Sequence, residues 1–149
     1  MLRLKQHLNS SSLYEYTLTE NETYDDPEGF KGFNEMRDGA TVSKTSFTII
    51  GNNYTVDGGG YSGIELKPYK FPEEAEEHTQ TLNISSVVWT NFTSANGGVI
   101  DNNAGTVNLT SGTFSSNRAT TDTAKGKGGA IANYNGGTVN IYEGATFTE

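Results

Sequence analysis

The sequence predicts an all-β protein built as a parallel β-helix, or β-solenoid, of about four rungs with an N-terminal cap. Short apolar strands recur along the chain, with a step of 25 residues from Leu82 to Val107 and of 32 residues from Val107 to Val139. Glycine accounts for 18 of the 149 residues, and hydrophobic residues for only 33%. A repeat of about 20–30 residues that varies by loop insertion is typical of a solenoid. The composition suits a narrow, elongated core better than a single compact one.

Residues 1–44 carry the least regular pattern, and we expect them to form the N-terminal cap. Within them, residues 13–18 have the composition of a strand that could add to the open sheet edge of a neighbouring chain. A solenoid end exposes unpaired backbone groups and an apolar cross-section, so it needs a cover. The parallel β-helix repeats are expected over residues 45–149, with a first rung of three short strands within 46–66. An acidic, proline-containing excursion at 67–80 interrupts them.

Each later rung repeats a pattern of alternating apolar and polar residues. Alternate residues of a strand point to opposite faces, so the apolar ones should enter the coil and stack on their equivalents in the next rung. Three aliphatic ladders are predicted, formed by Leu82, Val107 and Val139, by Ile84, Leu109 and Ile141, and by Ile100 and Ile131. An aromatic ladder is predicted from Phe92, Phe114 and Phe147.

Glycine and asparagine mark the corners between the strands. Positive φ angles at these corners favour glycine. The predicted turn residues are Gly97, Gly98, Gly128, Gly129, Asn102 and Asn133. Because Asn102 and Asn133 occupy equivalent turns, their side-chain amides are expected to pair along the coil axis.

The repeat motifs resemble those of a known family. Residues 128–131 read Gly-Gly-Ala-Ile and follow Phe114-Ser115-Ser116-Asn117. This pairing is similar to the Gly-Gly-Ala-aliphatic and Phe-x-x-Asn motifs of polymorphic outer-membrane proteins, which are bacterial surface adhesins and autotransporter passengers. The stretch from Phe47 to Ile64 is similar to the opening rung of adhesin-like and pectate-lyase-like β-helices. The resemblance covers about residues 45–149 and implies a right-handed coil in an extracellular or cell-surface setting.

The charge balance and the absence of cysteine exclude several classes of function. The chain has 10 Lys and Arg against 18 Asp and Glu, for a formal net charge of −8. Nucleic acid is therefore not an expected partner, because binding it needs a positive face. Cysteine is absent, which excludes disulfides and thiolate metal sites. Apolar runs are too short for a membrane span. Without an apolar export signal, and with a repeat that stops partway at Glu149, the chain is expected to be a trimmed piece.

An enzyme of the pectate-lyase-like kind is the alternative to a binding module. Such an enzyme needs converging carboxylates and a cation that removes a proton from the sugar. The coil offers Asp57, Asp101, Asp122, Arg118, Lys125 and Lys127. Asp57 lies in a turn signal, and Asp122 shares one solvated loop with the three cations. We therefore predict no catalytic residue, no metal and no cofactor.

Aromatic residues suggest a carbohydrate-binding alternative, because aromatic faces stack on sugars. The candidates are Tyr61, Tyr69, Phe71 and Trp89. Trp89 reads as a core or corner residue, whereas Tyr69 and Phe71 lie in the excursion and are the surface candidates.

The leading hypothesis is a non-enzymatic extracellular module, either adhesin-like or structural. Its expected partners are other copies that meet through the open β-helix ends, together with glycans or host surface proteins. A head-to-tail contact that does not close produces a filament, so end-to-end assembly into a filament is one predicted outcome.

Overall fold

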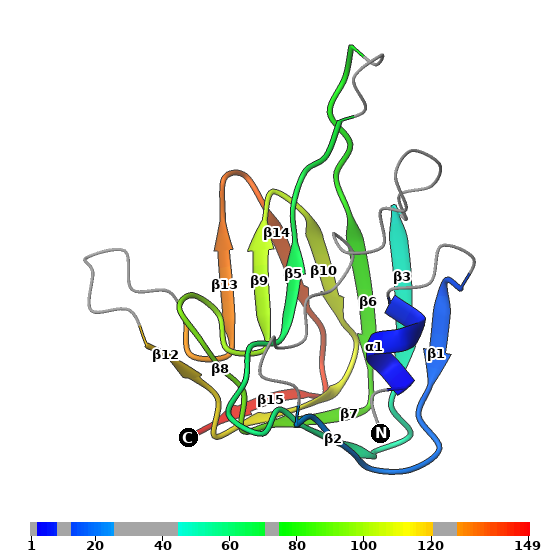
Figure 1. Cartoon of the computed structure of the whole chain (residues 1–149), viewed down its shortest axis with the longest axis vertical. Helices are drawn as coiled ribbons and strands as arrows, with labels where there is room; N and C mark the ends of the chain where they lie inside the picture. The colour runs from blue at the N-terminus through cyan, green and yellow to red at the C-terminus, as the bar shows by residue number, and fades with distance from the viewer. Residues whose placement is uncertain (1–2, 9–12, 26–44, 71–74, 121–127) are drawn as a thin grey trace.

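The computed structural model describes residues 3–8, 13–25, 45–70, 75–120 and 128–149. They form a parallel β-solenoid of about three turns, so the predicted all-β class and β-helix architecture are confirmed (Figure 1). Three sheets run along the coil. Sheet A holds β1 (Glu15–Thr17), β3 (Ser46–Ile50), β6 (Thr81–Ser85), β10 (Thr106–Leu109) and β14 (Thr138–Ile141). Sheet B holds β2 (Glu22–Thr23), β4 (Thr55–Asp57), β7 (Val87–Thr90), β11 (Gly112–Ser115) and β15 (Ala145–Thr148).

Sheet C holds the third strand of each complete turn, namely β5 (Ile64–Leu66), β9 (Ile100–Asn103) and β13 (Ile131–Tyr134). A short pair, β8 (Thr93–Ser94) and β12 (Arg118–Ala119), bridges sheets B and C. Every pairing between these strands is parallel. Three turns contain all three sheets, and partial turns precede and follow them, which is close to the four rungs predicted.

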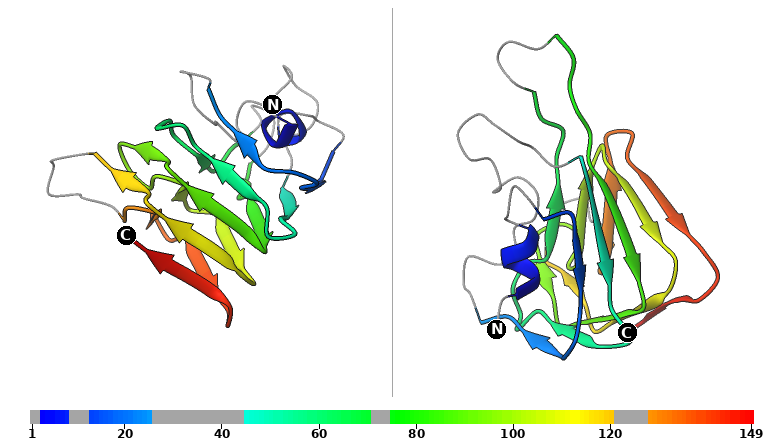
Figure 2. Two further views of the ribbon diagram at one scale, coloured as in Figure 1. Left: turned by 90° about the horizontal axis from the view of Figure 1, so that it is seen from below. Right: turned by 90° about the vertical axis from the view of Figure 1, so that its right-hand side faces the viewer.

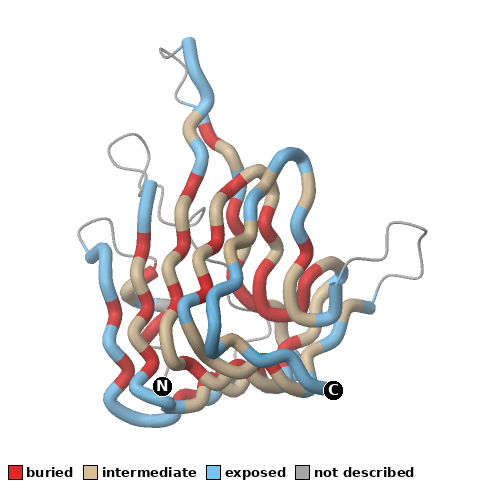
Figure 3. The backbone as a smooth tube through the Cα atoms, turned by 180° about the vertical axis from the view of Figure 1, so that it is seen from behind, coloured by how far each residue is buried: buried red, intermediate tan, exposed pale blue. Residues whose placement is uncertain are grey.

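The aliphatic ladders form as predicted. Leu82, Val107 and Val139 are partners in register in sheet A, and so are Ile84, Leu109 and Ile141. Ile100 pairs with Ile131 in sheet C, and Ile64 extends that ladder by one turn. Buried and partly exposed residues alternate along the strands (Figure 3), because the pleat sends every second side chain into the coil.

The aromatic ladder differs from the prediction at one position. Phe114 pairs with Phe147 as expected, and their rings stack with centroids 4.8 Å apart. On its other side, however, Phe114 pairs with Trp89 and not with Phe92. Phe92 lies beyond the end of β7, where it is fully buried and its ring centroid is 5.8 Å from that of Trp89. The sequence interpretation matched residue types and overlooked the 25-residue step, which connects position 89 to position 114.

The reason for the paired glycines also differs from the prediction. None of Gly97, Gly98, Gly128 and Gly129 has a positive φ angle. The backbone crowds Gly97, Gly98 and Gly128, since a Cβ atom on Gly97 would lie 2.1 Å from the carbonyl oxygen of Ile100. Gly129 has more room, with the carbonyl oxygen of Asn117 3.0 Å from such a Cβ atom. The left-handed positions are held by other residues, including Asn91 and Asn135.

The asparagine amides pair as predicted, but Asn102 and Asn133 lie within strands and not at the turns that the sequence predicted. The side-chain Nδ2 of Asn102 donates to Oδ1 of Asn133 at 2.7 Å, across the two turns. Both residues belong to sheet C strands, and each side chain reaches a backbone carbonyl of the following corner, that of Gly105 for Asn102 and that of Gly137 for Asn133. The amides therefore link strand to corner as well as turn to turn.

The coil begins upstream of residue 45, within the segment predicted as the cap. Strand β1 pairs with β3 of the same chain, and β2 pairs with β4. The helix α1 (Arg3–Leu8) lies against this first partial turn, and Figure 2 shows it at the opposite end of the coil from β15. Leu4 and Leu8 are fully buried and belong to the main hydrophobic core. The helix therefore closes the N-terminal end of the coil.

A buried carboxylate connects this helix to the coil. Glu22 is 2% exposed, and it accepts hydrogen bonds from the backbone N–H of Leu4, at 3.1 Å, and from the hydroxyl of Tyr16. An ion pair between Arg3 and Glu20 lies beside it. Satisfied hydrogen bonds offset the desolvation of the carboxylate, so α1 is held by polar contacts as well as by its two leucines.

Burial and the neighbouring Glu22 carboxylate raise the pKa of Tyr16 well above its ordinary value of 10.0. Below pH 10 the folded and unfolded states both keep the phenol proton. Above pH 10 the unfolded state loses the proton first, so stability is expected to fall as the pH rises. Urea unfolding over a series of alkaline pH values measures this decline. Tyr16→Phe should make the decline shallower, and an unchanged slope would contradict the assignment.

The excursion between β5 and β6 is closed by a single antiparallel bridge between Tyr69 and His78. Their rings stack with centroids 5.1 Å apart. Tyr69 is only 5% exposed, so the prediction that it is a surface aromatic is wrong; its ring stacks on that of His78. Phe71 lies outside the described residues. Trp89 is fully buried, in agreement with its interpretation as a core residue.

Candidate functional site

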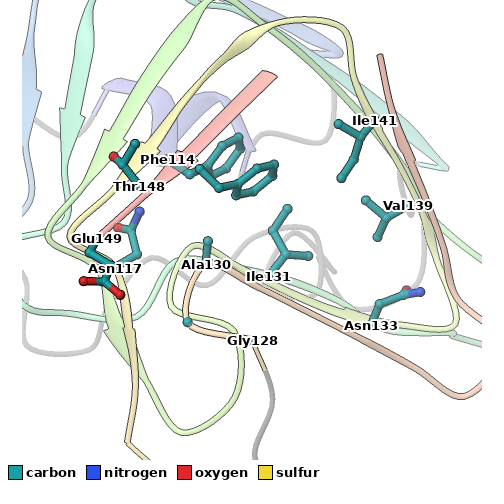
Figure 4. A pocket seen from close by; sticks show the side chains of 12 residues that line it. Phe114, Asn117, Gly128, Ala130, Ile131, Asn133, Val139, Ile141, Thr148 and Glu149 are labelled. Atoms are coloured by element: carbon teal, nitrogen blue, oxygen red, sulfur yellow. The ribbon is translucent and has the colours of Figure 1, made fainter. Parts of the chain in front are cut away.

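The C-terminal end of the coil is an open, apolar cross-section. It surrounds a hollow of about 640 Å³ between the last strands of the three sheets. Figure 4 shows Val139 and Ile141 of β14 pointing toward Ala130 and Ile131. The lining residues are Phe114, Asn117, Gly128, Gly129, Ala130, Ile131, Asn133, Val139, Ile141, Phe147, Thr148 and Glu149.

Equivalent residues one turn apart show how much of this end is uncovered. Leu109 is fully buried, whereas Ile141, its partner in the next turn, is 56% exposed. Phe114 is 1% exposed, whereas Phe147 is 43% exposed. The side chains point into the coil in both turns, so the exposure arises because no further turn lies beyond β14 and β15 among the described residues. Covering these apolar side chains would lower the free energy, because it removes their surface from water.

Backbone groups are open at the same end. Strands β13, β14 and β15 are the terminal strands of sheets C, A and B among the described residues. A terminal strand presents N–H and C=O groups that can pair with another strand. The end therefore combines an apolar surface with a hydrogen-bonding edge, which is the arrangement that receives an added strand.

Polar side chains at the rim of this hollow are already committed to the coil. Asn117 accepts a hydrogen bond from the backbone N–H of Phe92 at 3.0 Å and donates to the carbonyl of Trp89 at 3.1 Å. Asn133 donates to the carbonyl of Gly137 at 2.9 Å. These amides hold the shape of the last turn and do not form a chemical centre.

The two described carboxylates that the sequence offers to a lyase-like enzyme, Asp57 and Asp101, lie in different sheets and have separate partners. Asp57 lies at the end of β4, where its Oδ1 accepts from the backbone N–H of Gly59 at 2.8 Å and from Nδ2 of Asn91 at 3.1 Å. Asp101 lies in sheet C and accepts from Nδ2 of Asn96 at 2.8 Å. Arg118 is exposed on β12, and Asp122, Lys125 and Lys127 lie outside the described residues. Within the described part of the chain, no three His, Cys, Asp or Glu side chains are grouped as metal ligands.

A second hollow, of about 320 Å³, lies on the outer side of sheet C. Glu65 and Asp101 are neighbours in register there, and Nζ of Lys67 lies 2.7 Å from Glu65. Burial, together with a hydrogen bond to Asp101, raises the pKa of Tyr134 above its ordinary value. Glu65 has an ammonium partner, and Oδ2 of Asp101 has an amide partner.

The fold and the two hollows define a β-solenoid with one closed and one open end. Comparison with models of known protein families, with curated proteins and with solved structures gives no match. The resemblance to polymorphic outer-membrane proteins therefore stays a prediction from the motifs. No helix among the described residues is long and apolar enough to cross a membrane.

Eight of the predicted ladder and turn residues line the open end: Phe114, Gly128, Gly129, Ile131, Asn133, Val139, Ile141 and Phe147. The others lie deeper in the coil or at earlier corners. Sequence reasoning did not single out Ala130, Asn117, Thr148 or Glu149, although all four line the hollow. Ala130 and Asn117 belong to the Gly-Gly-Ala-aliphatic and Phe-x-x-Asn motifs. Their places in these repeat motifs could have identified them as structural residues of the coil.

Proposed function

We propose that this chain is a non-enzymatic β-solenoid module of an extracellular or cell-surface protein, adhesin-like or structural, which associates through its open C-terminal end. The observation that carries the proposal is the contrast between equivalent positions, with Leu109 fully buried and Ile141 56% exposed. A further layer of strands on β14 and β15 would bury Ile141 and Phe147, just as β14 and β15 cover Leu109 and Phe114. The separate positions of Asp57 and Asp101 support a role without catalysis.

The occupant we propose is the same end of a second copy. Two equal surfaces that meet across a two-fold axis form a closed pair, in which the β14 edges face each other in antiparallel directions. The filament expected from the sequence would need two open ends, and α1 covers the N-terminal one with Leu4 and Leu8 fully buried. For the described residues, with α1 against the first turn and β14 and β15 uncovered, pairing of the last turns fits better than a head-to-tail array.

Light scattering after size-exclusion chromatography, over a range of protein concentrations, tests this association. The wild-type chain should show a mass that rises toward twice the monomer mass, because burial of Ile141 and Phe147 drives pairing. Ile141→Glu should remain monomeric, since it places two carboxylates in the paired interface. Tyr54→Glu changes a 36% exposed aromatic residue at a remote corner and is the matched control, which should pair like the wild type.

Circular dichroism of each variant separates loss of pairing from loss of folding. A wild-type mass that stays at the monomer value at every concentration would overturn the proposed association. Filaments in electron micrographs would show that the ends meet head to tail. Cleavage of polygalacturonate by the purified chain would overturn the non-enzymatic assignment.

A further inference from the structure

The outer face of sheet A carries two straight columns of uncharged polar side chains. The first column contains Ser46, Thr81, Thr106 and Thr138, and the second contains Thr48, Asn83, Asn108 and Asn140. All eight are at least partly exposed. Parallel strands lie about 4.8 Å apart and alternate residues about 6.6 Å apart along a strand. The eight side chains therefore form a regular grid of hydroxyl and amide groups.

Hydrogen bonds hold the second column in a fixed arrangement. Nδ2 of Asn108 donates to Oδ1 of Asn83 at 2.8 Å, and Nδ2 of Asn140 donates to Oδ1 of Asn108 at 2.8 Å. Each amide keeps a second N–H for an external acceptor. The threonines beside them are β-branched, which restricts their χ1 rotamers. Because these groups are already ordered, a ligand that uses them loses little additional conformational entropy on binding.

The part of this face that β3, β6, β10 and β14 form is also free of charge. None of the outward residues of β3, β6, β10 and β14 is charged, although the chain has 10 basic and 18 acidic residues, or 28 of 149. Glu15 of β1 is the partner of Thr48 in register and places one charge at the N-terminal margin of the second column. Solvated protein surfaces usually mix charged residues of both signs. A neutral face with many hydrogen-bond donors and acceptors suits a neutral partner that also carries hydrogen-bond donors and acceptors.

Sheet B provides an internal comparison. Its outward column contains Thr55, Thr113 and Thr146, but Val88 interrupts the hydroxyls, and Asp57 adds a charge in the next column. No amide ladder between turns is found on the outer face of sheet B among the described residues. The continuous, neutral and internally ordered grid is thus a property of sheet A.

We propose that the outer face of sheet A binds a neutral polysaccharide laid along the coil axis. Sugar hydroxyls donate and accept hydrogen bonds, as the threonine and asparagine side chains do. A single such bond is weak because water competes for it. A polymer that repeats the same contacts on successive turns gains affinity through its linked sites. The inference extends the proposed function by naming a partner class, and it concerns a different face from the C-terminal end.

Depletion binding to insoluble polysaccharides tests the proposal, with the 149-residue chain produced in bacteria. The probes are amorphous cellulose, mannan and cross-linked dextran, with a polygalacturonate gel as the anionic comparison. The wild type should bind at least one neutral polymer more tightly than the gel, and short oligosaccharides of the same sugar should compete weakly. The triple variant Thr81→Val, Thr106→Val, Thr138→Val should lower the association constant by about tenfold, because it removes the hydroxyl column and keeps the β-branched shape.

The matched control is Thr55→Val, Thr113→Val, Thr146→Val, which removes three hydroxyls from sheet B and should change binding less than about twofold. Retention on none of the neutral polymers would overturn the proposal, as would equal losses in the two triple variants. If the wild type is a dimer and the sheet A triple variant is a monomer, this face binds a second copy of the chain. That result would also overturn the polysaccharide proposal. Ile141→Glu should abolish pairing and keep polysaccharide binding, so the two proposals fail separately.

Discussion

Replacing Phe114 by alanine is expected to lower the free energy of unfolding by about 3–5 kcal/mol. Phe114 is 1% exposed and stacks between Trp89, with ring centroids 6.4 Å apart, and Phe147, at 4.8 Å. Its removal leaves a cavity in the middle of the aromatic ladder, and a narrow coil has few side chains that can move to fill it. Urea unfolding followed by circular dichroism measures the change.

Phe147→Ala is the matched control for this experiment. Phe147 occupies the equivalent position one turn later and is 43% exposed. Because about half of its side chain already contacts water, its loss should cost only about 1 kcal/mol. If Phe114→Ala cost no more than Phe147→Ala, the aromatic ladder would not be the buried element that the ring stacking indicates.

Gly97→Ala should destabilise the protein by about 3 kcal/mol, through crowding of the backbone. A Cβ atom there would lie 2.1 Å from the carbonyl oxygen of Ile100 and 2.3 Å from the amide nitrogen of Ala132. Both are backbone atoms of paired strands, so neither can move without disturbing the pairing of β9 with β13. Thermal and urea unfolding of the variant measure the loss.

Gly129 is the second glycine of the same motif one turn later, equivalent to Gly98, and offers a graded comparison. Among the described residues, the atom nearest to a Cβ on Gly129 would be the carbonyl oxygen of Asn117, at 3.0 Å. Gly129→Ala should therefore cost about 1 kcal/mol or less. If the two variants lost similar amounts of unfolding free energy, the glycines would be required for a shared backbone conformation and not because a Cβ atom would clash.

The ladder positions could be predicted from the sequence because strand alternation determines which side chains enter the coil. Leu82, Val107 and Val139 stack in register for that reason. The aromatic error arose where two criteria disagreed, since residue type matches Phe92 to Phe114 and the 25-residue step matches Trp89 to Phe114. A constant step is the better guide in a coil, because pairing in register requires it.

Two other features were hidden from sequence reasoning. Glycine can be required for a positive φ angle or for close backbone approach, and the sequence of Gly97-Gly98 does not distinguish them. The first partial turn was hidden because β1 and β2 have only three and two residues, too few to show a repeat. The sequence analysis expected association through an open end of the coil. It did not identify which residues form that end, because the same ladder positions recur in every turn and only those of the last described turn are uncovered.

The closed end gives the coil an origin for folding. Helix α1, with Leu4 and Leu8 fully buried, covers one side of the first turn, so only the other side of that turn is free to guide the next. Each completed turn is then a template for the strands that follow it, as in other repeat proteins. Because α1 is made before the turns that follow it in the chain, the order of assembly along the coil would match the order of synthesis. Inserting or deleting one whole turn should alter the length of the molecule and leave this direction of growth unchanged.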